Sequence, residues 1–319
     1  MLQQTTVGAV RPRYPAFLAR FPDVATLARA RPETVLAAWS GLGYYARARN
    51  LHAAARALVR DHSGRLPADP AALRALPGFG EYMAAAVASL AFGARLPAVD
   101  ANVARVLSRL FAIGGVVGTR PHTERVRLQA AELLPPARPG DVTAALMDLG
   151  QLICTPRNPR CPACPLASEC RALARAEVER FPRKKPRPGA ERVFVAAAAA
   201  QDGGRTLLVR STQALMRGLW LFPTAHADSP EAALSRLRLV ARDLGLRVAG
   251  SAPIGRTRHT VVHRHLTIAV YAATRAPRPA ARASAAVRWL TPAQLAAAAI
   301  PTLTRRIAAA GLSRAPMAL

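Results

Sequence analysis

The chain has 319 residues, of which 45 are Lys or Arg and 18 are Asp or Glu, so its formal net charge is +27. This length allows a sizeable hydrophobic core and predicts two domains, and the lack of a long uncharged apolar run argues against a membrane span. The basic excess indicates a polyanionic partner such as nucleic acid. Because arginine and alanine are abundant throughout, part of this charge is compositional, and charge alone identifies no function.

The first part of the chain reads as short helices separated by turn residues. The sequence opens at Met1 without a helix cap, and apolar residues recur at helical spacing as far as Phe21. Turn signals such as Gly41-Leu42-Gly43 and Leu66-Pro67 then continue to the first cysteine. No strand-like alternation interrupts this part, so we expect an all-α domain over residues 1–175.

A possible DNA-binding turn lies at Leu76-Pro77-Gly78-Phe79-Gly80, between a short helix and an alanine-rich helix that runs to about Ala91. Gly78 and Gly80 can adopt backbone angles closed to other residues, so the turn can present bare N–H groups to a DNA phosphate. A plain connection between two helices explains the same residues equally well.

Asp100 precedes a segment that is expected to be helical as far as Phe111. An aspartate at this position can accept hydrogen bonds from the first turn of a helix, and taken alone this capping role is the better explanation. Asn102 follows two residues later.

All four cysteines, Cys154, Cys161, Cys164 and Cys170, lie in one proline-rich segment. Two disulfides would suit a small secreted domain, but the length of the chain and the lack of a hydrophobic signal segment favour a reducing compartment. Zinc sites usually pair two Cys-x2-Cys hooks, whereas here a single hook is flanked by gaps of six and five residues. The spacing therefore favours four thiolates around a [4Fe-4S] cluster over a zinc ion.

A basic, proline-rich run from Phe181 to Gly189 reads as an interdomain linker, and we place the linker at residues 176–192. Beyond it, residues 193–319 are expected to form an α+β domain. The strands predicted there are Val193–Ala199, Thr206–Arg210 and His265–Ala273, and the helices are Pro230–Leu244 and Ala293–Ala299.

The order of hairpin, aspartate and cysteine loop resembles the endonuclease III and MutY branch of the helix-hairpin-helix DNA glycosylases. Segments similar to MutY also occur at Met1–Thr5, at Trp39–Leu51 and at Met147–Gly150. Members that also cut the DNA backbone carry a lysine nucleophile in the hairpin helix, where this chain has Tyr82. The resemblance therefore implies a monofunctional glycosylase that removes adenine mispaired with 8-oxoguanine or guanine during base excision repair.

The resemblance also implies roles for individual residues near the sugar. Asp100 would face the oxocarbenium ion that develops there, and Asn102 and Tyr82 would orient its surroundings. Gly78 and Gly80 would contact the DNA backbone, and double-stranded DNA carrying the mispair would be the partner.

A second group of residues would lie beside the lesion. By resemblance, Gln4 and Tyr44 wedge into the base stack, with Gln3 next to them on the DNA. Without the resemblance, the two glutamines would be read as a solvated helix start, and Tyr44 and Tyr45 as core contacts.

The second half resembles the MutT-like, Nudix-type domain with which MutY enzymes read the oxidised guanine, most clearly at Gly218–Pro223. Nudix hydrolases hold magnesium with a glutamate-rich helix, but Pro230–Leu244 offers only Glu231 and Asp243. We therefore do not expect pyrophosphate hydrolysis.

The loop that reads the lesion departs from the family pattern. Family members place Phe-Ser-His there, and this chain matches only at His263, with Val261 and Val262 in the other two positions. We therefore expect weaker discrimination of 8-oxoguanine from guanine.

The family places the glutamate that protonates the departing adenine two residues before the segment that begins here at Met1, so we expect impaired excision. Glu81 is then the nearest acid in the sequence, and Ala144 stands where the family has Glu or Gln. The alternative is a catalytically inactive protein that binds mismatched DNA. We expect a monomer, in a bacterial-type cytoplasm and associated with the nucleoid, without membrane attachment.

Overall fold

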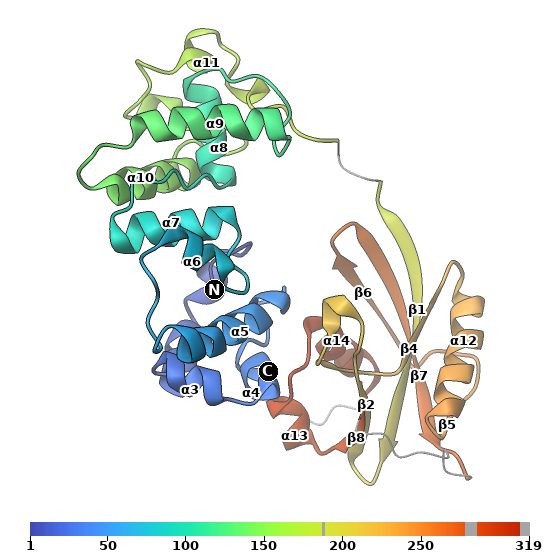
Figure 1. Cartoon of the computed structure of the whole chain (residues 1–319). Coiled ribbons are helices and arrows are strands. Elements are labelled where there is room, and N and C mark those ends of the chain that lie inside the picture. The colour runs from blue at the N-terminus through green and yellow to red at the C-terminus, as the bar shows by residue number, and fades with distance from the viewer. Residues whose placement is uncertain (187–188, 278–285, 313–319) are drawn as a thin grey trace. The chain divides into compact units, whose positions relative to one another are not determined.

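The computed structural model describes residues 1–186, 189–277 and 286–312. Arg187 and Pro188 of the predicted linker, and residues 278–285 and 313–319 of the predicted second domain, lie outside the described residues. The chain forms two compact units, which we call the helical unit (Ala57–Arg187) and the mixed unit (Met1–Arg56 with Pro188–Leu319) (Figure 1). The predicted division into the segments 1–175, 176–192 and 193–319 stays a prediction.

The helical unit is built from packed helices with short connections. Asp69 caps its first complete helix by accepting the N–H of Ala72 at 2.7 Å, and Val106, Leu107 and Val126 lie at the centre of its core. Its elements are α6 (Pro70–Ala75), α7 (Glu81–Phe92), α8 (Ala101–Leu110), α9 (Arg120–Leu133), α10 (Pro139–Leu152), η1 (Cys161–Ala163), α11 (Arg171–Ala174) and η2 (Val178–Arg180), after the end of α5 (Ala46–Asp61).

The N-terminal part of the mixed unit is also helical. It comprises α1 (Val7–Val10), α2 (Tyr14–Arg20), α3 (Val24–Arg29), α4 (Pro32–Ala38) and the start of α5. These helices bury Phe17 against Trp39, with ring centroids 5.9 Å apart in an edge-on arrangement, and the same core includes Leu219 from the second half of the chain. The first 56 residues therefore pack with the C-terminal part of the chain.

The C-terminal part of the mixed unit is a sheet with a helix on each face. The described strands are β1 (Glu191–Asp202), β2 (Arg205–Arg210), β3 (Trp220–Leu221), β4 (Thr224–Ala227), β5 (Leu246–Val248), β6 (Gly255–Val261), β7 (Arg264–Arg275) and β8 (Val287–Leu290). They run in the order β3-β2-β1-β7-β5, with β4 on β1, β6 on β7 and β8 on β2. The long central pair, β1 and β7, is parallel, and the other pairs are antiparallel.

Two helices cover this sheet. α12 (Pro230–Asp243) buries Leu237 on the face that carries Tyr271, and α14 (Thr302–Gly311) buries Ile307 on the face that carries Ile268. Gly255 is required beneath α14, because a Cβ there would lie 1.8 Å from the carbonyl oxygen of Ala310. The remaining elements are α13 (Pro292–Ala297) and η3 (Ala214–Met216).

The predicted order of an all-α part followed by an α+β part is confirmed. Each predicted strand and helix of the second half exists, with ends shifted by at most three residues. The sequence prediction missed β3, β4, β5, β6, β8 and α14. Val261, interpreted as part of the lesion-reading loop, belongs to strand β6, so only Val262 and His263 form the turn. Within the described ranges no helix is long and apolar enough to cross a membrane.

Candidate active site and cysteine loop

Asp100 lies at the N-terminal end of α8, where its carboxylate is held by two hydrogen bonds. Oδ1 accepts the N–H of Val103 at 2.7 Å, and Oδ2 accepts the side-chain amide of Asn102 at 3.2 Å. The predicted capping role is therefore present. The carboxylate remains partly exposed, so one group caps the helix and still presents negative charge at the surface of the helical unit.

Tyr82 lies near this carboxylate, at the second residue of α7. Burial raises the pKa of the Tyr82 phenol, and the charge of Asp100 raises it further, so the phenol stays protonated and can donate a hydrogen bond. The turn before it has Gly78 in the left-handed region, with φ of 81°, and Gly80 at the N-cap without a capping side chain. The hairpin, Tyr82, Asn102 and Asp100 thus lie in the same unit.

Arg105 connects the Asp100 site to the cysteine loop, and the sequence did not single it out. Its guanidinium donates to Asn102 Oδ1 at 2.9 Å, to the Gly150 carbonyl at 2.6 Å and to the Cys154 carbonyl at 2.7 Å. Burial lowers the pKa of Arg105, and negative charge at Cys154 and at Asp100 opposes this shift. In a chain with so many arginines, only its position three residues after Asn102 could have suggested this contact.

Gly150, the last residue of the predicted Met147–Gly150 motif, lets α10 approach the start of α8. A Cβ at this position would lie 2.7 Å from the Cβ of Asn102 and 3.0 Å from its carbonyl oxygen. Glycine is therefore required at this position, because any side chain would contact Asn102 and push away the Gly150 carbonyl that accepts a hydrogen bond from Arg105.

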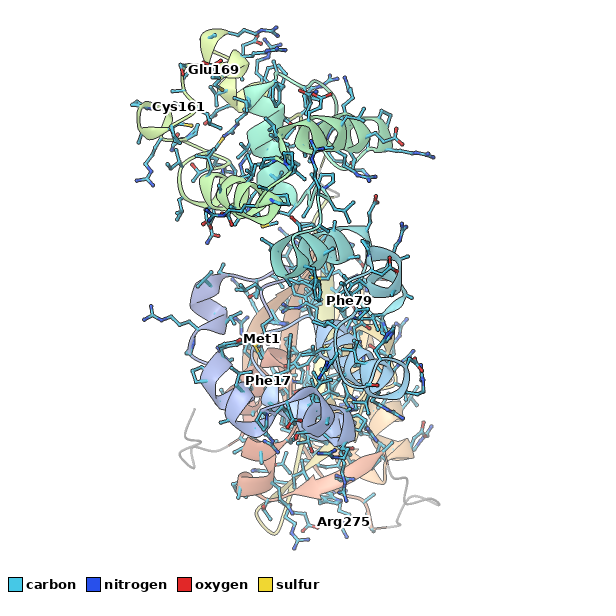
Figure 2. The ribbon with its side chains drawn as sticks, turned by 60° about the vertical axis from the view of Figure 1, so that its left-hand side comes forward. Met1, Phe17, Phe79, Cys161, Glu169 and Arg275 are labelled. Carbon is cyan, nitrogen blue, oxygen red and sulfur yellow. The ribbon has the colours of Figure 1, made fainter. Side chains whose placement is uncertain are left out.

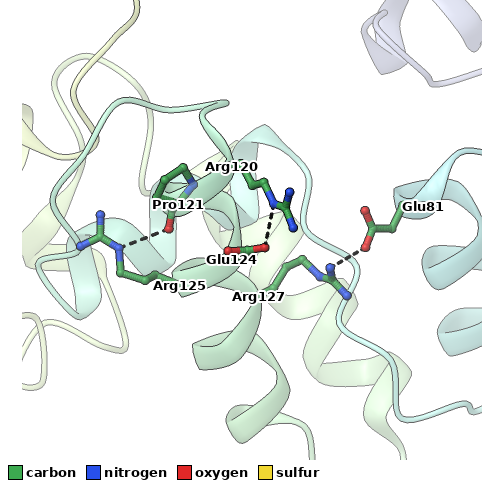
Figure 3. A network of polar contacts seen from close by, with 6 residues as sticks. All are labelled: Glu81, Arg120, Pro121, Glu124, Arg125 and Arg127. Carbon is green, nitrogen blue, oxygen red and sulfur yellow. Dashed lines mark hydrogen bonds and ion pairs between the residues drawn. The ribbon is translucent and has the colours of Figure 1, made fainter.

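Glu81, the acid nearest to the hairpin in the sequence, forms an ion pair with Arg127 of α9 at 2.5 Å (Figure 3). Both side chains are about half exposed. The Glu81 carboxylate is therefore already engaged by a guanidinium from α9.

The four cysteines lie in one loop and its flanking turns, each half-buried, with Cys161 at the start of η1 (Figure 2). Burial raises the pKa of the Cys161 thiol, and the negative charges of Cys154, Cys170 and Cys164 raise it further. Among the residues that the structure describes, no group of three or more His, Cys, Asp or Glu side chains is arranged to hold a metal ion. The donor set nevertheless fits a soft metal centre, because four thiols lie in one segment and Cys161 is near enough to the other three to be affected by their charge, which a bound cation would offset.

Arg109 forms hydrogen bonds to the start of the cysteine loop. Its side chain is buried, and it donates to Cys154 Sγ at 3.3 Å, to the Thr155 carbonyl at 2.7 Å and to the Phe181 carbonyl at 3.1 Å. A buried guanidinium with these acceptors fixes the start of the loop. No pattern in the sequence indicates this role either.

The predicted wedge residues belong to the mixed unit, and both have unusual backbones. Gln4 has φ of 53° and Tyr44 has φ of 45°, in the left-handed region that only glycine, asparagine and aspartate adopt readily. Tyr44 is 54% exposed, which contradicts the core explanation for it, whereas Tyr45 is buried as that explanation requires. Held in strained backbone, an exposed aromatic ring is suited to contact a ligand.

Arg47 joins the two wedge segments. Its guanidinium donates to the carbonyls of Met1 and Gln3 and, at 3.0 Å, to that of Leu42, and it lies 5.7 Å from the centre of the Tyr44 ring. The Gln3–Gln4 segment and the Tyr44 loop are therefore held together by one side chain that sequence reasoning did not identify.

His263 lies in the two-residue turn between β6 and β7. Its Nε2 is 3.7 Å from Glu191, which also accepts from Arg264 at 2.8 Å. Val262 beside it is 74% exposed and has φ of 56°, an unfavourable conformation for a β-branched residue. The structure thus brings Gln3, Gln4 and Tyr44 together in one part of the mixed unit and presents His263 at a separate hairpin tip.

Two family matches cover most of the chain. Residues 1–136 match HhH-GPD, the HhH-GPD superfamily base excision DNA repair protein family, and residues 195–310 match the NUDIX domain family. Together with the fold, these matches define a helix-hairpin-helix base excision repair protein that carries a Nudix-like domain.

Individual relatives are named more specifically. The chain is 34% identical to the human adenine DNA glycosylase over 96% of this chain and 66% of that protein, and 32% identical to the mouse protein over 96% and 69%. The adenine DNA glycosylase of Mycolicibacterium smegmatis is 43% identical over 54% of this chain and 57% of its own length. The chain belongs to the adenine DNA glycosylase family, which confirms the family predicted from the sequence. It spans about two thirds of its human and mouse relatives.

Proposed function

We propose that this chain hydrolyses the N-glycosidic bond of adenine mispaired with 8-oxoguanine or guanine in double-stranded DNA, in base excision repair. The observation that carries the proposal is the Asp100 carboxylate, which is held by Val103 N–H and Asn102 and lies near a protonated Tyr82. The named relatives and the family match support the same reaction class.

In the proposed reaction the bond between C1′ of the sugar and N9 of adenine breaks, and positive charge develops at C1′. Asp100 stabilises this charge electrostatically, and its fixed hydrogen bonds avoid the cost of reorienting it during the reaction. Adenine takes up a proton at a ring nitrogen as it leaves. A water molecule then adds to C1′ and releases a proton, so the reaction consumes one water molecule and balances in protons. Glu81 is not assigned the protonation of adenine, because its carboxylate is paired with Arg127.

The recognition residues act before the chemical step. Gln4 and Tyr44 enter the base stack beside the mispair and favour extrusion of adenine, and His263 contacts the opposite base. Gln3, Gly78 and Gly80 contact the DNA backbone. Under this proposal the protein works as a monomer on nucleoid DNA in a bacterial-type cytoplasm.

Four cysteines, Cys154, Cys161, Cys164 and Cys170, are proposed to hold a [4Fe-4S] cluster, which would organise the loop between α10 and α11. The charge interaction of Cys161 with the other three cysteines and the buried Arg109 beside Cys154 support this assignment. Protein purified without oxygen should contain iron and sulfide and absorb broadly near about 400 nm. Stoichiometric zinc without iron would overturn the assignment.

The experiment separates catalysis from helix capping at Asp100. Asparagine caps helices as well as aspartate does but carries no charge, so Asp100→Asn should keep the stability of the helical unit. It should nevertheless lower single-turnover excision from an adenine:8-oxoguanine duplex by about 10²-fold or more. Asp100→Ala should lose both excision and about 1 kcal/mol of stability.

Two outcomes would contradict the proposal. Undiminished excision by Asp100→Asn would remove Asp100 from the reaction. Selective binding of the mispair by the unaltered chain, with no excision even in long single-turnover reactions, would support the alternative of an inactive mismatch-binding protein.

A further inference from the structure

We propose that one face of the C-terminal sheet, formed by β6, β7 and the start of β1, binds the phosphate backbone of duplex DNA. We call it the basic face and define it by Arg192, Arg256, Arg258, Thr260, His265 and Thr267. The inference rests on the proposed function only in taking duplex DNA as the partner, and it adds a contact surface outside the hairpin, the wedges and the His263 turn.

Strand register places these residues on one side of the sheet. Residues directly opposite each other in neighbouring strands point to the same face. Thr260 is opposite His265, which is opposite Arg192, and Arg258 is opposite Thr267 in the next row. Arg256 follows opposite Ala269. Three successive rows of the sheet therefore each carry one arginine.

The three arginines are exposed and unpaired. Arg192, Arg256 and Arg258 are all exposed, and within the described part of the chain none of their side chains makes a hydrogen bond or ion pair. Other arginines of the same sheet do have acidic partners, since Arg264 pairs with Glu191 and Arg275 with Asp202. Arg205 and Arg247 of this sheet are likewise exposed and have no acidic partner among the described residues, so what distinguishes the three arginines is their placement in successive rows of one face.

α12 covers only part of this face. It packs over the β1 and β4 side, against Phe194 and Ala196, and against Tyr271 further along β7, and it leaves Arg192, Arg256 and Arg258 exposed. In Figure 1 the ends of β1 and β6 extend above α12. α14 packs against the opposite face, to which Glu191 also belongs by its pairing with Arg264. Among the residues of β1, β6 and β7, the acidic side chain on this side is Asp202, which lies at the far end of β1 and pairs with Arg275.

The chemistry of the face suits a phosphate backbone better than bases. Alternate residues of a strand lie about 7 Å apart and neighbouring strands about 4.8 Å apart, so the guanidinium groups form a flat array rather than a pocket. Arginine donates paired hydrogen bonds to phosphate oxygens, and the threonine hydroxyls can add further donors. A flat array without a pocket or aromatic platform offers little sequence readout, so the expected contribution is to affinity.

The position of the face explains its use. On this face, Thr260 and His265 form the row nearest to the turn that carries His263, one residue pair beyond Val261 and Arg264. Backbone contacts along β6 and β7 would therefore begin where the predicted lesion contact ends, and would hold the strand opposite adenine against the turn. Such contacts fix register without adding specificity.

The test is the salt dependence of binding to a matched duplex without a lesion, measured by fluorescence anisotropy between about 50 and 300 mM NaCl. The triple variant Arg192→Ala, Arg256→Ala, Arg258→Ala should reduce the slope of log affinity against log salt by about 2 to 3, because each neutralised phosphate contributes about 0.9. A triple lysine variant keeps the charge and should keep most of the slope.

The matched control removes three exposed arginines elsewhere in the same domain, with Arg205→Ala, Arg242→Ala and Arg247→Ala combined. This control should change the slope by less than about 0.5. Equal losses for the two alanine triples, or no loss for the basic-face triple, would overturn the inference. Thermal unfolding of all variants checks the fold, and if the alanine triple is unstable, the single variant Arg258→Glu decides the question, because it should reduce the slope by about 1 whereas Arg205→Glu should leave it unchanged.

This test does not depend on glycosylase activity. A reduced slope in a protein that excises no adenine would leave the basic face in place and remove only the proposed reaction. Normal excision with an unchanged slope would do the reverse.

Discussion

The Asp100 region and the wedge region hold their functional side chains in opposite ways. Around Asp100 the backbone is regular, and the side chains are linked by hydrogen bonds through Asn102 and Arg105 to the Cys154 carbonyl. At Gln4, Tyr44 and Val262 the backbone is left-handed, and the side chains are exposed. A group that stabilises charge gains from being fixed in advance, whereas a group that enters a base stack must be available to a partner, at the cost of local strain.

The largest effect on stability should come from substituting Arg109, because this removes hydrogen bonds inside the helical unit that hold the start of the cysteine loop. Arg109→Met keeps the volume of the side chain but leaves the carbonyls of Thr155, Pro156 and Phe181 without their donor. We expect the helical unit to lose about 3 kcal/mol, because buried carbonyls left without a donor cost about 1 to 3 kcal/mol each. Hydrogen exchange of α8 amides under denaturant measures the loss. Arg175→Met, at an exposed site, is the control, and an equal change in both would contradict the assignment.

Gly150→Ala should have the next largest effect. The new methyl group would lie 2.7 Å from Asn102, so α8 and α10 must separate. Overpacking of this kind costs about 1 to 3 kcal/mol, and it should also lower excision because Asn102 orients Asp100. Gly118→Ala provides a comparison at a glycine with open space around it, although its φ of 80° adds strain there. Unchanged excision and stability in Gly150→Ala would show that the close approach is not required.

Arg105→Ala should separate orientation from stability. The variant keeps the Asp100–Val103 cap but removes the donor that fixes the amide of Asn102. We expect about tenfold slower single-turnover excision with little change in substrate affinity, corresponding to about 1.4 kcal/mol in the barrier. Arg105→Lys should recover little of the lost excision rate, because a lysine lacks the planar guanidinium that donates to three acceptors at once. A change in affinity alone, with excision unaltered, would contradict a role in orienting the site.

The smallest effect concerns strain at the hairpin tip. Asparagine tolerates the left-handed region better than valine does, so Val262→Asn should stabilise the mixed unit by about 1 kcal/mol. Val262→Ile retains the β-branched side chain and should bring no gain. Thermal unfolding compares the two variants, and equal midpoints would mean that the positive φ carries no measurable cost.

Sequence reasoning succeeded where a residue type is tied to a local pattern. The four cysteines, the glycine hairpin and Asp100 at a helix start could be found because spacing and capping preferences are properties of short segments. The elements β4 and β5 were missed because four and three residues are too few to show a period. Arg47, Arg105 and Arg109 were missed for another reason, since their partners are main-chain carbonyls, which leave no mark on the sequence.

Arg47 has a consequence for how the wedge region responds to a ligand. By binding the Met1 carbonyl 46 residues away, its guanidinium closes the N-terminal segment into a non-covalent ring. Such closures restrict the chain between their ends. A ligand that displaces the Tyr44 side chain would disturb the Arg47 guanidinium near it and weaken its hydrogen bond to the Met1 carbonyl. Binding of a ligand at Gln4 and Tyr44 should therefore be detectable as faster amide exchange within residues 1–5.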